Sequence, residues 1–189
     1  MKYDSAATRA RLLAAAHDEF VRVGLAGARV DRIAAAASAN KQAIYAYFGS
    51  KEALFDAVLA ARLQVLADVA PFDPGDLPGY AGALFDALVA DPGVQRLSQW
   101  KMLEVPEPSE GEVDAHVTKA AALAEHSGVD LTTATDVLMI VFAAALSWNS
   151  TASKIRNPLD DDNSRRLTQH RAAMVRAVAA LTDALLEKP

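Results

Sequence analysis

The residues best suited to chemistry lie between positions 41 and 48, where side-chain types that contact DNA bases recur at helical spacing. In a helix, Ile44 and Phe48 share one face because they are four residues apart. The opposite face then presents four residues: Lys41, Gln42, Tyr45 and Ala46. A glutamine amide pairs with adenine, a lysine reaches guanine or a phosphate, and small apolar groups touch the thymine methyl. This helix is therefore suited to the major groove.

A second short helix is expected to position this face. Residues 30–37 predict a helix with Ile33 and Ala37 facing inward, and Ser38 follows in a tight turn. Asn40 is the expected N-cap of the next helix. Together the two segments predict a helix-turn-helix.

Lys51 stands where a purely structural choice would be an acidic residue. It follows Ser50, the expected N-cap of a helix that runs to about Val69. A cation at the first helical position costs about 0.3–1 kcal/mol, because the helix dipole is positive there. A nearby phosphate reverses that sign, so we interpret Lys51 as a DNA-backbone contact. The alternative is a solvated lysine.

The charge pattern agrees with a polyanion partner for the first part of the chain. The formal net charge of −5 excludes a globally basic nucleic-acid coat. Residues 1–55 nevertheless hold eight basic and five acidic side chains, against eleven and nineteen in the rest. A basic head on an acidic body suggests that the head meets DNA. Four other basic residues of the head are interpreted as surface charge: Lys2, Arg11, Arg22 and Arg32.

No catalytic or metal-binding pattern accompanies these residues. The chain has no cysteine, which excludes disulfides and thiolate chemistry. Zinc-protease, phosphate-loop and nucleophile-elbow motifs are absent. His116 and His126 are ten residues apart, which leaves them about 80° out of alignment on a helix. The sequence therefore predicts no enzyme, no metal and no cofactor.

The remaining segments predict helices and no strand, which makes the fold all-α with about nine helices. Gly24 is expected to end the first helix, and residues 71–79 form the clearest linker. Further helix starts are expected at Asp91, at a Ser109–Glu112 capping box and at Asp130. A final helix is predicted over about 163–186.

The last two long helices carry more apolar residues than one buried face needs. The helix from Asp130 to Trp148 is apolar on nearly every side, and the final helix has an apolar stripe. Such helices need cover on two sides, namely a body core and a second copy of the chain. An ordinary monomeric core is the alternative. The longest apolar run, residues 137–146, is half of what a bilayer needs, so a cytoplasmic protein is expected.

Residues 9–59 resemble the DNA-binding domain of the TetR (tetracycline-repressor) family of bacterial transcription regulators. The matching positions are Arg9, Leu12, Leu13, Ala16, Phe20, Gly24, Val30, Ile33, Ala34, Ala37, Ile44, Tyr45, Tyr47, Phe48, Ser50, Lys51, Glu52 and Leu54. Two departures matter. Ser38-Ala39-Asn40 replaces the family's Gly-Val-Ser, and Arg29 replaces a threonine that caps the second helix. Because serine lacks the freedom of the family's glycine at positive φ, the turn is expected to be slightly strained. A guanidinium at Arg29 can reach a phosphate instead.

The resemblance implies a helix-turn-helix DNA-binding domain over residues 1–50 and a helical ligand-binding and dimerisation domain over 51–189. It assigns DNA contacts to Arg29, Lys41, Gln42, Ala43, Tyr45, Ala46, Tyr47 and Lys51. It implies a small-molecule pocket, for which the candidate residues are Phe85, Trp100, Leu103, Met139, Phe142 and Trp148. Because Trp100 and Trp148 carry ring N–H groups that need partners, one of them is expected to face a polar cavity.

We therefore predict a homodimeric, sequence-specific transcription regulator, a repressor that an apolar small molecule releases from a palindromic operator. One alternative is a regulator that binds no ligand, or an activator. Another is an all-helical protein-binding adaptor, or an enzyme, with a degenerate head. Helix 51–69 is expected to act as a rod about 27 Å long that carries the effector signal.

Overall fold

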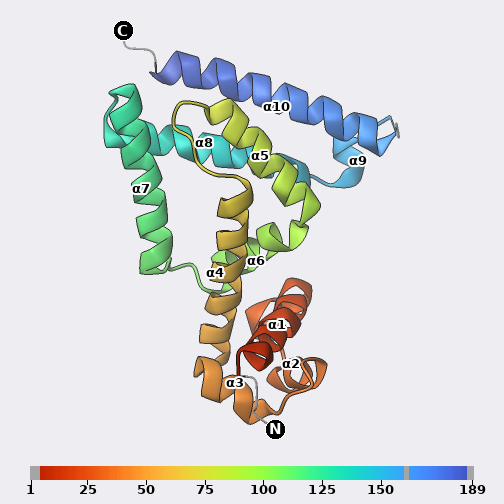
Figure 1. Ribbon diagram of the computed structural model, residues 1–189. Coiled ribbons are helices and arrows are strands. Elements are labelled where there is room, and N and C mark those ends of the chain that lie inside the picture. Colours follow the sequence, from red (N-terminus) through yellow and green to blue (C-terminus); the bar gives the residue numbers. More distant parts are fainter. Residues whose placement is uncertain (1–4, 160–161, 187–189) are drawn as a thin grey trace. The chain divides into compact units, whose positions relative to one another are not determined.

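The computed structural model describes residues 5–159 and 162–186 (Figure 1). Within these residues the chain forms ten helices and no strand, which confirms the all-α prediction. Nine helices are close to those expected, and the tenth is a single turn, α9, that the sequence pattern did not indicate. Their bounds are α1 Ser5–Gly27, α2 Val30–Ala36, α3 Lys41–Phe48, α4 Lys51–Val69, α5 Leu77–Ala90, α6 Pro92–Glu104, α7 Glu110–Ser127, α8 Leu131–Ser150, α9 Ser153–Arg156 and α10 Asn163–Leu186. Lys2 lies outside the described residues.

Contacts within the chain group these helices into two compact units. The first unit holds residues 5–65 and 93–107, which include α1, α2, α3, most of α4 and nearly all of α6. The second unit holds 66–92, 108–159 and 162–186, with α5 and α7 to α10. The functional division at residue 50 stays a prediction.

The first unit is built on a core that α1 shares with α2, α3 and α4. Phe20 of α1 is fully buried and meets Phe55 of α4 edge to face, with ring centroids 5.0 Å apart. Ile33 and Ile44 are also fully buried, so α2 and α3 turn the predicted faces inward. Burying aromatic and branched side chains in this way supplies most of the stability of a small helical unit.

Gly24 interrupts α1, as expected, because its backbone leaves helical geometry at φ 72° and ψ −175°. Helical turns resume as far as Gly27. A Cβ at Gly24 would lie 2.8 Å from the Trp100 ring of α6 and 2.7 Å from Glu104 Oε1. The Glu104 carboxylate accepts hydrogen bonds from the backbone N–H groups of Leu25 at 2.6 Å and Ala26 at 3.0 Å. Helix α6 therefore holds the break in α1.

The second unit has its core where α5, α8 and α10 pack together and α7 packs on α8. Phe85, Val137 and Val141 are fully buried there. Burial raises the pKa of the Tyr80 hydroxyl to about 12. Helix α8, which has a mean hydropathy of 1.6, is long and apolar enough to cross a membrane by length and composition alone. The core helix of a soluble protein meets the same criterion.

Four of the predicted helix caps are confirmed, and α6 begins at Pro92, directly after the expected start at Asp91. Asn40 Oδ1 accepts from the N–H of Ala43 at 2.8 Å, and Ser50 Oγ accepts from that of Ala53 at 3.0 Å. Ser109 and Glu112 form the reciprocal capping box. Asp130 accepts the N–H groups at the start of α8, and these bonds lower the pKa of its carboxyl group.

Candidate DNA-binding site

The orientation of α3 follows from one buried side chain. Ile44 is fully buried, so the opposite face of this eight-residue helix is exposed. The exposed residues are Lys41, Gln42, Tyr45 and Ala46, the four expected from the spacing. Ala43 and Tyr47 are half-buried at the edges of this face. Phe48, which was expected in the core, is only half-buried: it packs against the core, and the Arg9 guanidinium lies over its ring, 5.1 Å from the centroid.

The turn before α3 has the expected strain. Ser38 has φ 50°, and within the described residues it is the single non-glycine with positive φ. Arg11 of α1 donates from Nε to the carbonyl oxygen of Ala37 at 3.1 Å and from Nη2 to Thr8 Oγ1 at 3.1 Å. Its interpretation as simple surface charge is therefore incomplete, because the exposed Arg11 also ties α1 to the end of α2.

Lys41 and Asp31 form an exposed ion pair across the helix-turn-helix, with Nζ 3.2 Å from Oδ1. Both side chains are about half or more accessible to water. Such surface pairs contribute about 0–1 kcal/mol. The Lys41 ammonium can therefore leave Asp31 for a phosphate or a base at small cost.

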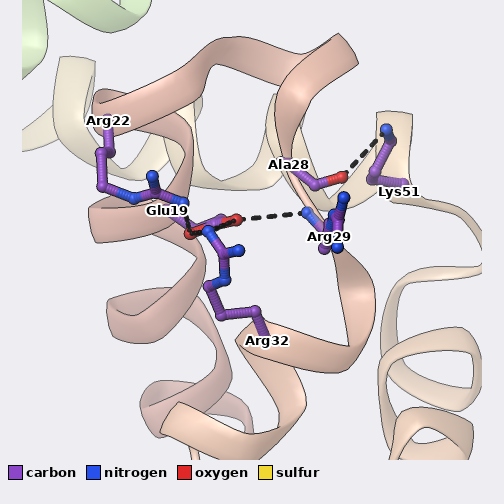
Figure 2. A network of polar contacts seen from close by, with 6 residues as sticks. All are labelled: Glu19, Arg22, Ala28, Arg29, Arg32 and Lys51. Carbon is purple, nitrogen blue, oxygen red and sulfur yellow. Dashed lines mark hydrogen bonds and ion pairs between the residues drawn. The ribbon is translucent and has the colours of Figure 1, made fainter.

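Two residues assigned to the DNA backbone, Arg29 and Lys51, lie near each other. Lys51 begins α4, and its Nζ donates to the carbonyl oxygen of Ala28 at 3.3 Å (Figure 2). Arg29 directly follows Ala28 in the chain, and its side chain is exposed. Lys51 is thus neither fully solvated nor buried, and two of its three protons remain available for other acceptors.

A buried carboxylate that was not predicted from the sequence lies among the other charged groups of this region. Glu19 of α1 is 5% exposed and lies among Arg22, Arg32 and the backbone of Arg29 (Figure 2). Burial alone raises the pKa of Glu19. The hydrogen bonds from Arg22 and Arg29, together with the charges of Arg22 and Arg32, outweigh burial and lower it.

Arg22 and Arg32 were interpreted as surface charge, and this interpretation is incomplete. Each is half-exposed, but Arg22 Nη2 lies 2.7 Å from Glu19 Oε2 and Arg32 Nη1 lies 3.3 Å from Glu19 Oε1. An acidic residue directly before a core phenylalanine, with an arginine three positions later, is the signal that could have revealed this cluster.

The six candidate effector residues lie in three places. Trp100 and Leu103 belong to α6 in the first unit, where Leu103 is 73% exposed. Phe85 and Trp148 are buried in the second unit, and the ring of His170 lies 5.7 Å and 5.3 Å from theirs. The Trp100 ring N–H is buried and has no hydrogen-bond partner among the described residues.

The remaining two, Met139 and Phe142 of α8, line an apolar hollow of about 100 Å³ between α7 and α8. The rest of its lining is His116, Val117, Ala120, Leu131, Thr135 and Leu138. A larger hollow of about 400 Å³ lies between the loop before α5 and the end of α10, and none of the candidate residues lines it. Nowhere in the described ranges do three His, Asp or Glu side chains gather as a metal site requires.

Comparison with known proteins agrees with this arrangement of a helix-turn-helix unit and a helical body. The family model for bacterial regulatory proteins of the tetR family matches residues 12–58. The model for the tetracyclin repressor-like C-terminal domain matches residues 76–179. Together they define a DNA-binding transcription regulator, and the chain belongs to the TetR family.

Individual relatives agree. The HTH-type transcriptional repressor SCO4008 of Streptomyces coelicolor is 42% identical over 153 residues, which cover 77% of this chain and 79% of that protein. The crystal structure of SCO4942 from the same organism superimposes with a TM-score of 0.79 at 37% identity, over 92% of this chain and 97% of that one. The HTH-type transcriptional repressor NicS of Pseudomonas putida is 46% identical over 52 residues, 28% of this chain and 24% of that protein.

Proposed function

We propose that this chain is a cytoplasmic repressor that binds a palindromic operator as a homodimer and leaves it when an apolar small molecule binds. The observation that carries the proposal is the exposed face of α3, where an amide, an ammonium and a phenol stand opposite the buried Ile44. Repression is supported by the matching relative SCO4008, which is a transcriptional repressor.

The eight proposed DNA contacts divide into two kinds. Gln42, Ala43 and Ala46, with Tyr45 beside them, lie on or at the edge of the α3 face and are proposed to read bases. The residues proposed to contact phosphates are Arg29, Lys41, Tyr47 and Lys51. Phosphate contacts fix the register of a protein on DNA, whereas base contacts carry sequence preference.

Exposed apolar side chains support a dimer. Met139 and Ile140 of α8 are 64% and 40% exposed, and Leu185 of α10 is 42% exposed, although both helices also bury residues in the core of the second unit. A two-fold dimer requires a palindromic operator whose half-sites lie about 34–36 Å apart. Light scattering at micromolar concentration is expected to show twice the 20.0 kDa chain mass.

The apolar hollow that Met139 and Phe142 line supports an apolar class of effector. An effector weakens operator binding only if it binds the DNA-free state of the protein more tightly than the DNA-bound state. A tenfold difference in affinity at each of two sites weakens operator binding about 100-fold at most. By the same linkage, operator DNA must weaken effector binding by the same total factor. Isothermal titration of a releasing compound with and without the operator measures this reciprocity.

Selection of bound duplexes from a random pool tests the proposal directly. The wild-type chain is expected to enrich a palindromic duplex. A fluorescently labelled copy of that duplex should bind the chain with an affinity that falls steeply as salt is raised. Enrichment of no sequence would favour the adaptor alternative. Once the operator is known, a reporter under its control separates a repressor from an activator.

A further inference from the structure

Helix α2 begins without a side-chain cap of its own. Its N-cap residue is Arg29, which has the extended backbone of a cap, φ −112° and ψ 118°, but within the described chain makes no side-chain bond to the helix. An uncapped first turn is normally destabilising, because its N–H groups lack acceptors.

The carboxylate of Glu19 reaches this helix start from α1. Glu19 Oε1 accepts the backbone N–H of Arg29 at 3.3 Å (Figure 2). Its negative charge also lies at the positive end of the α2 dipole, which is a favourable position. The contact spans ten residues of sequence, so it fixes α2 against a different helix rather than within its own first turn.

Two arginines hold the carboxylate in place. Arg22, one turn along α1, binds Oε2 at 2.7 Å, and Arg32 of α2 lies 3.3 Å from Oε1. A carboxylate that is 5% exposed is costly unless it is paired and hydrogen-bonded, so these partners explain how Glu19 can be buried. The carboxylate is therefore anchored on both helices that it joins.

We propose that Glu19 is a positioning residue for DNA binding, which supplies the acceptor for the N-cap N–H of α2 and holds the backbone of Arg29 where its side chain meets a phosphate. The inference rests on the proposed function, because it requires that Arg29 contact DNA. A purely structural Glu19 would stabilise the head equally for every DNA contact. A positioning Glu19 acts through Arg29.

A double-mutant cycle separates these two roles. The probe is a duplex that the wild-type chain has selected from a random pool, and affinity is measured by fluorescence anisotropy. Glu19→Gln is expected to weaken binding about fivefold, the effect of one hydrogen bond. In an Arg29→Ala background the same change should have less than a twofold effect. An equal loss in both backgrounds, or no loss in either, overturns the proposal.

Asp18→Asn is the matched control. Asp18 precedes Glu19 on α1 and its side chain is 85% exposed, so the variant removes the same charge without touching α2. Asp18→Asn is expected not to weaken DNA binding, because removing an exposed negative charge cannot increase the repulsion between the protein and the phosphates. A fivefold loss in this variant would attribute the effect to charge alone and overturn the proposal.

Two further measurements keep the test decisive if Glu19→Gln does not fold. Arg22→Ala removes the shortest contact to the carboxylate from a side chain that is half-exposed. It should weaken binding in the same direction, by less, and only when Arg29 is present. A loss that persists in Arg29→Ala overturns the proposal.

Amide hydrogen exchange in the full chain without DNA reports on the cap itself. Arg22→Ala should speed exchange over residues 30–33, and Arg29→Ser, which supplies a hydroxyl cap, should reduce that increase. Unchanged exchange overturns the cap. If the wild-type chain selects no duplex, the proposed function fails and the positioning role falls with it. Normal duplex binding without the predicted coupling overturns the inference alone.

Discussion

The proposed DNA contacts and the proposed effector contacts differ in how the chain brings them together. Six of the eight DNA-contact residues lie on α3, within seven consecutive positions. Of the other two, Arg29 is the N-cap of α2 and Lys51 is the first residue of α4. The six effector residues come from α5, α6 and α8 and lie in three separate places. Helical periodicity predicts which residues share one face of one helix. It does not predict which faces of several helices enclose a cavity.

The largest expected effect is the difference in stability between substituting a proposed effector residue in the core and substituting one on the surface. Phe85→Ala should lower the free energy of unfolding by about 3–5 kcal/mol, because Phe85 is 1% exposed and its loss leaves a cavity. Leu103→Ala, at a side chain that is 73% exposed, should change it by less than about 0.5 kcal/mol. Urea denaturation measures both. Similar values for the two would contradict the burial pattern.

The stability of the first unit also depends on one contact between residues distant in sequence, the packing of α6 against Gly24. Gly24→Ala should destabilise the chain by about 2–4 kcal/mol, because the new Cβ meets Trp100 and Glu104 while the backbone keeps positive φ. Gly49→Ala is the matched control, since Gly49 has φ 82° and nothing within 4 Å of an added Cβ. Its cost should be about 1–2 kcal/mol. Thermal unfolding that gives equal shifts for both variants would show that α6 does not hold the break.

The α3 face itself is tested by the contrast between a base contact and a phosphate contact. Gln42→Ala should cost about 1–3 kcal/mol at the selected duplex and relax base preference. Lys51→Ala should weaken binding to all duplexes alike and flatten the salt slope by about 1. Lys154→Ala, at an exposed lysine of α9 in the second unit, is the control for simple charge loss. An unchanged ranking of half-sites in Gln42→Ala would show that the proposed register of α3 is wrong.

The smallest expected effect lies in the second unit and depends on pH. Burial, and then the charge of Arg166, lower the pKa of His170 below its ordinary value of 6.5. Its Nε2 lies 2.9 Å from Ser147 Oγ. Below pH 6.5 the unfolded chain binds the proton first, so stability should fall as the pH drops towards the folded pKa and then level off. His170→Gln should remove that part of the slope between pH 7.5 and 5.5. An identical slope in both proteins would exclude His170 as its source.

Local sequence patterns predict the features that depend on neighbours a few residues away. The all-α fold, the caps at Asn40, Ser50, Ser109 and Asp130, and the exposed face of α3 follow from local spacing and backbone chemistry. Each involves hydrogen bonds or periodicity within one or two turns, and such terms are the same wherever the helix packs.

The pairing of charged groups and the choice of apolar residues around a cavity depend instead on how the helices pack in three dimensions. Glu19 binds the backbone of Arg29 ten positions away, Lys51 reaches Ala28 across 23, and Glu104 holds Leu25 across 79. Nothing in the periodicity around these residues indicated that Trp100 and Leu103 belong to the first unit, whereas Phe85 and Met139 belong to the second. The physical reason is that a helical pattern specifies a face, whereas the partner of that face depends on how several helices pack at once.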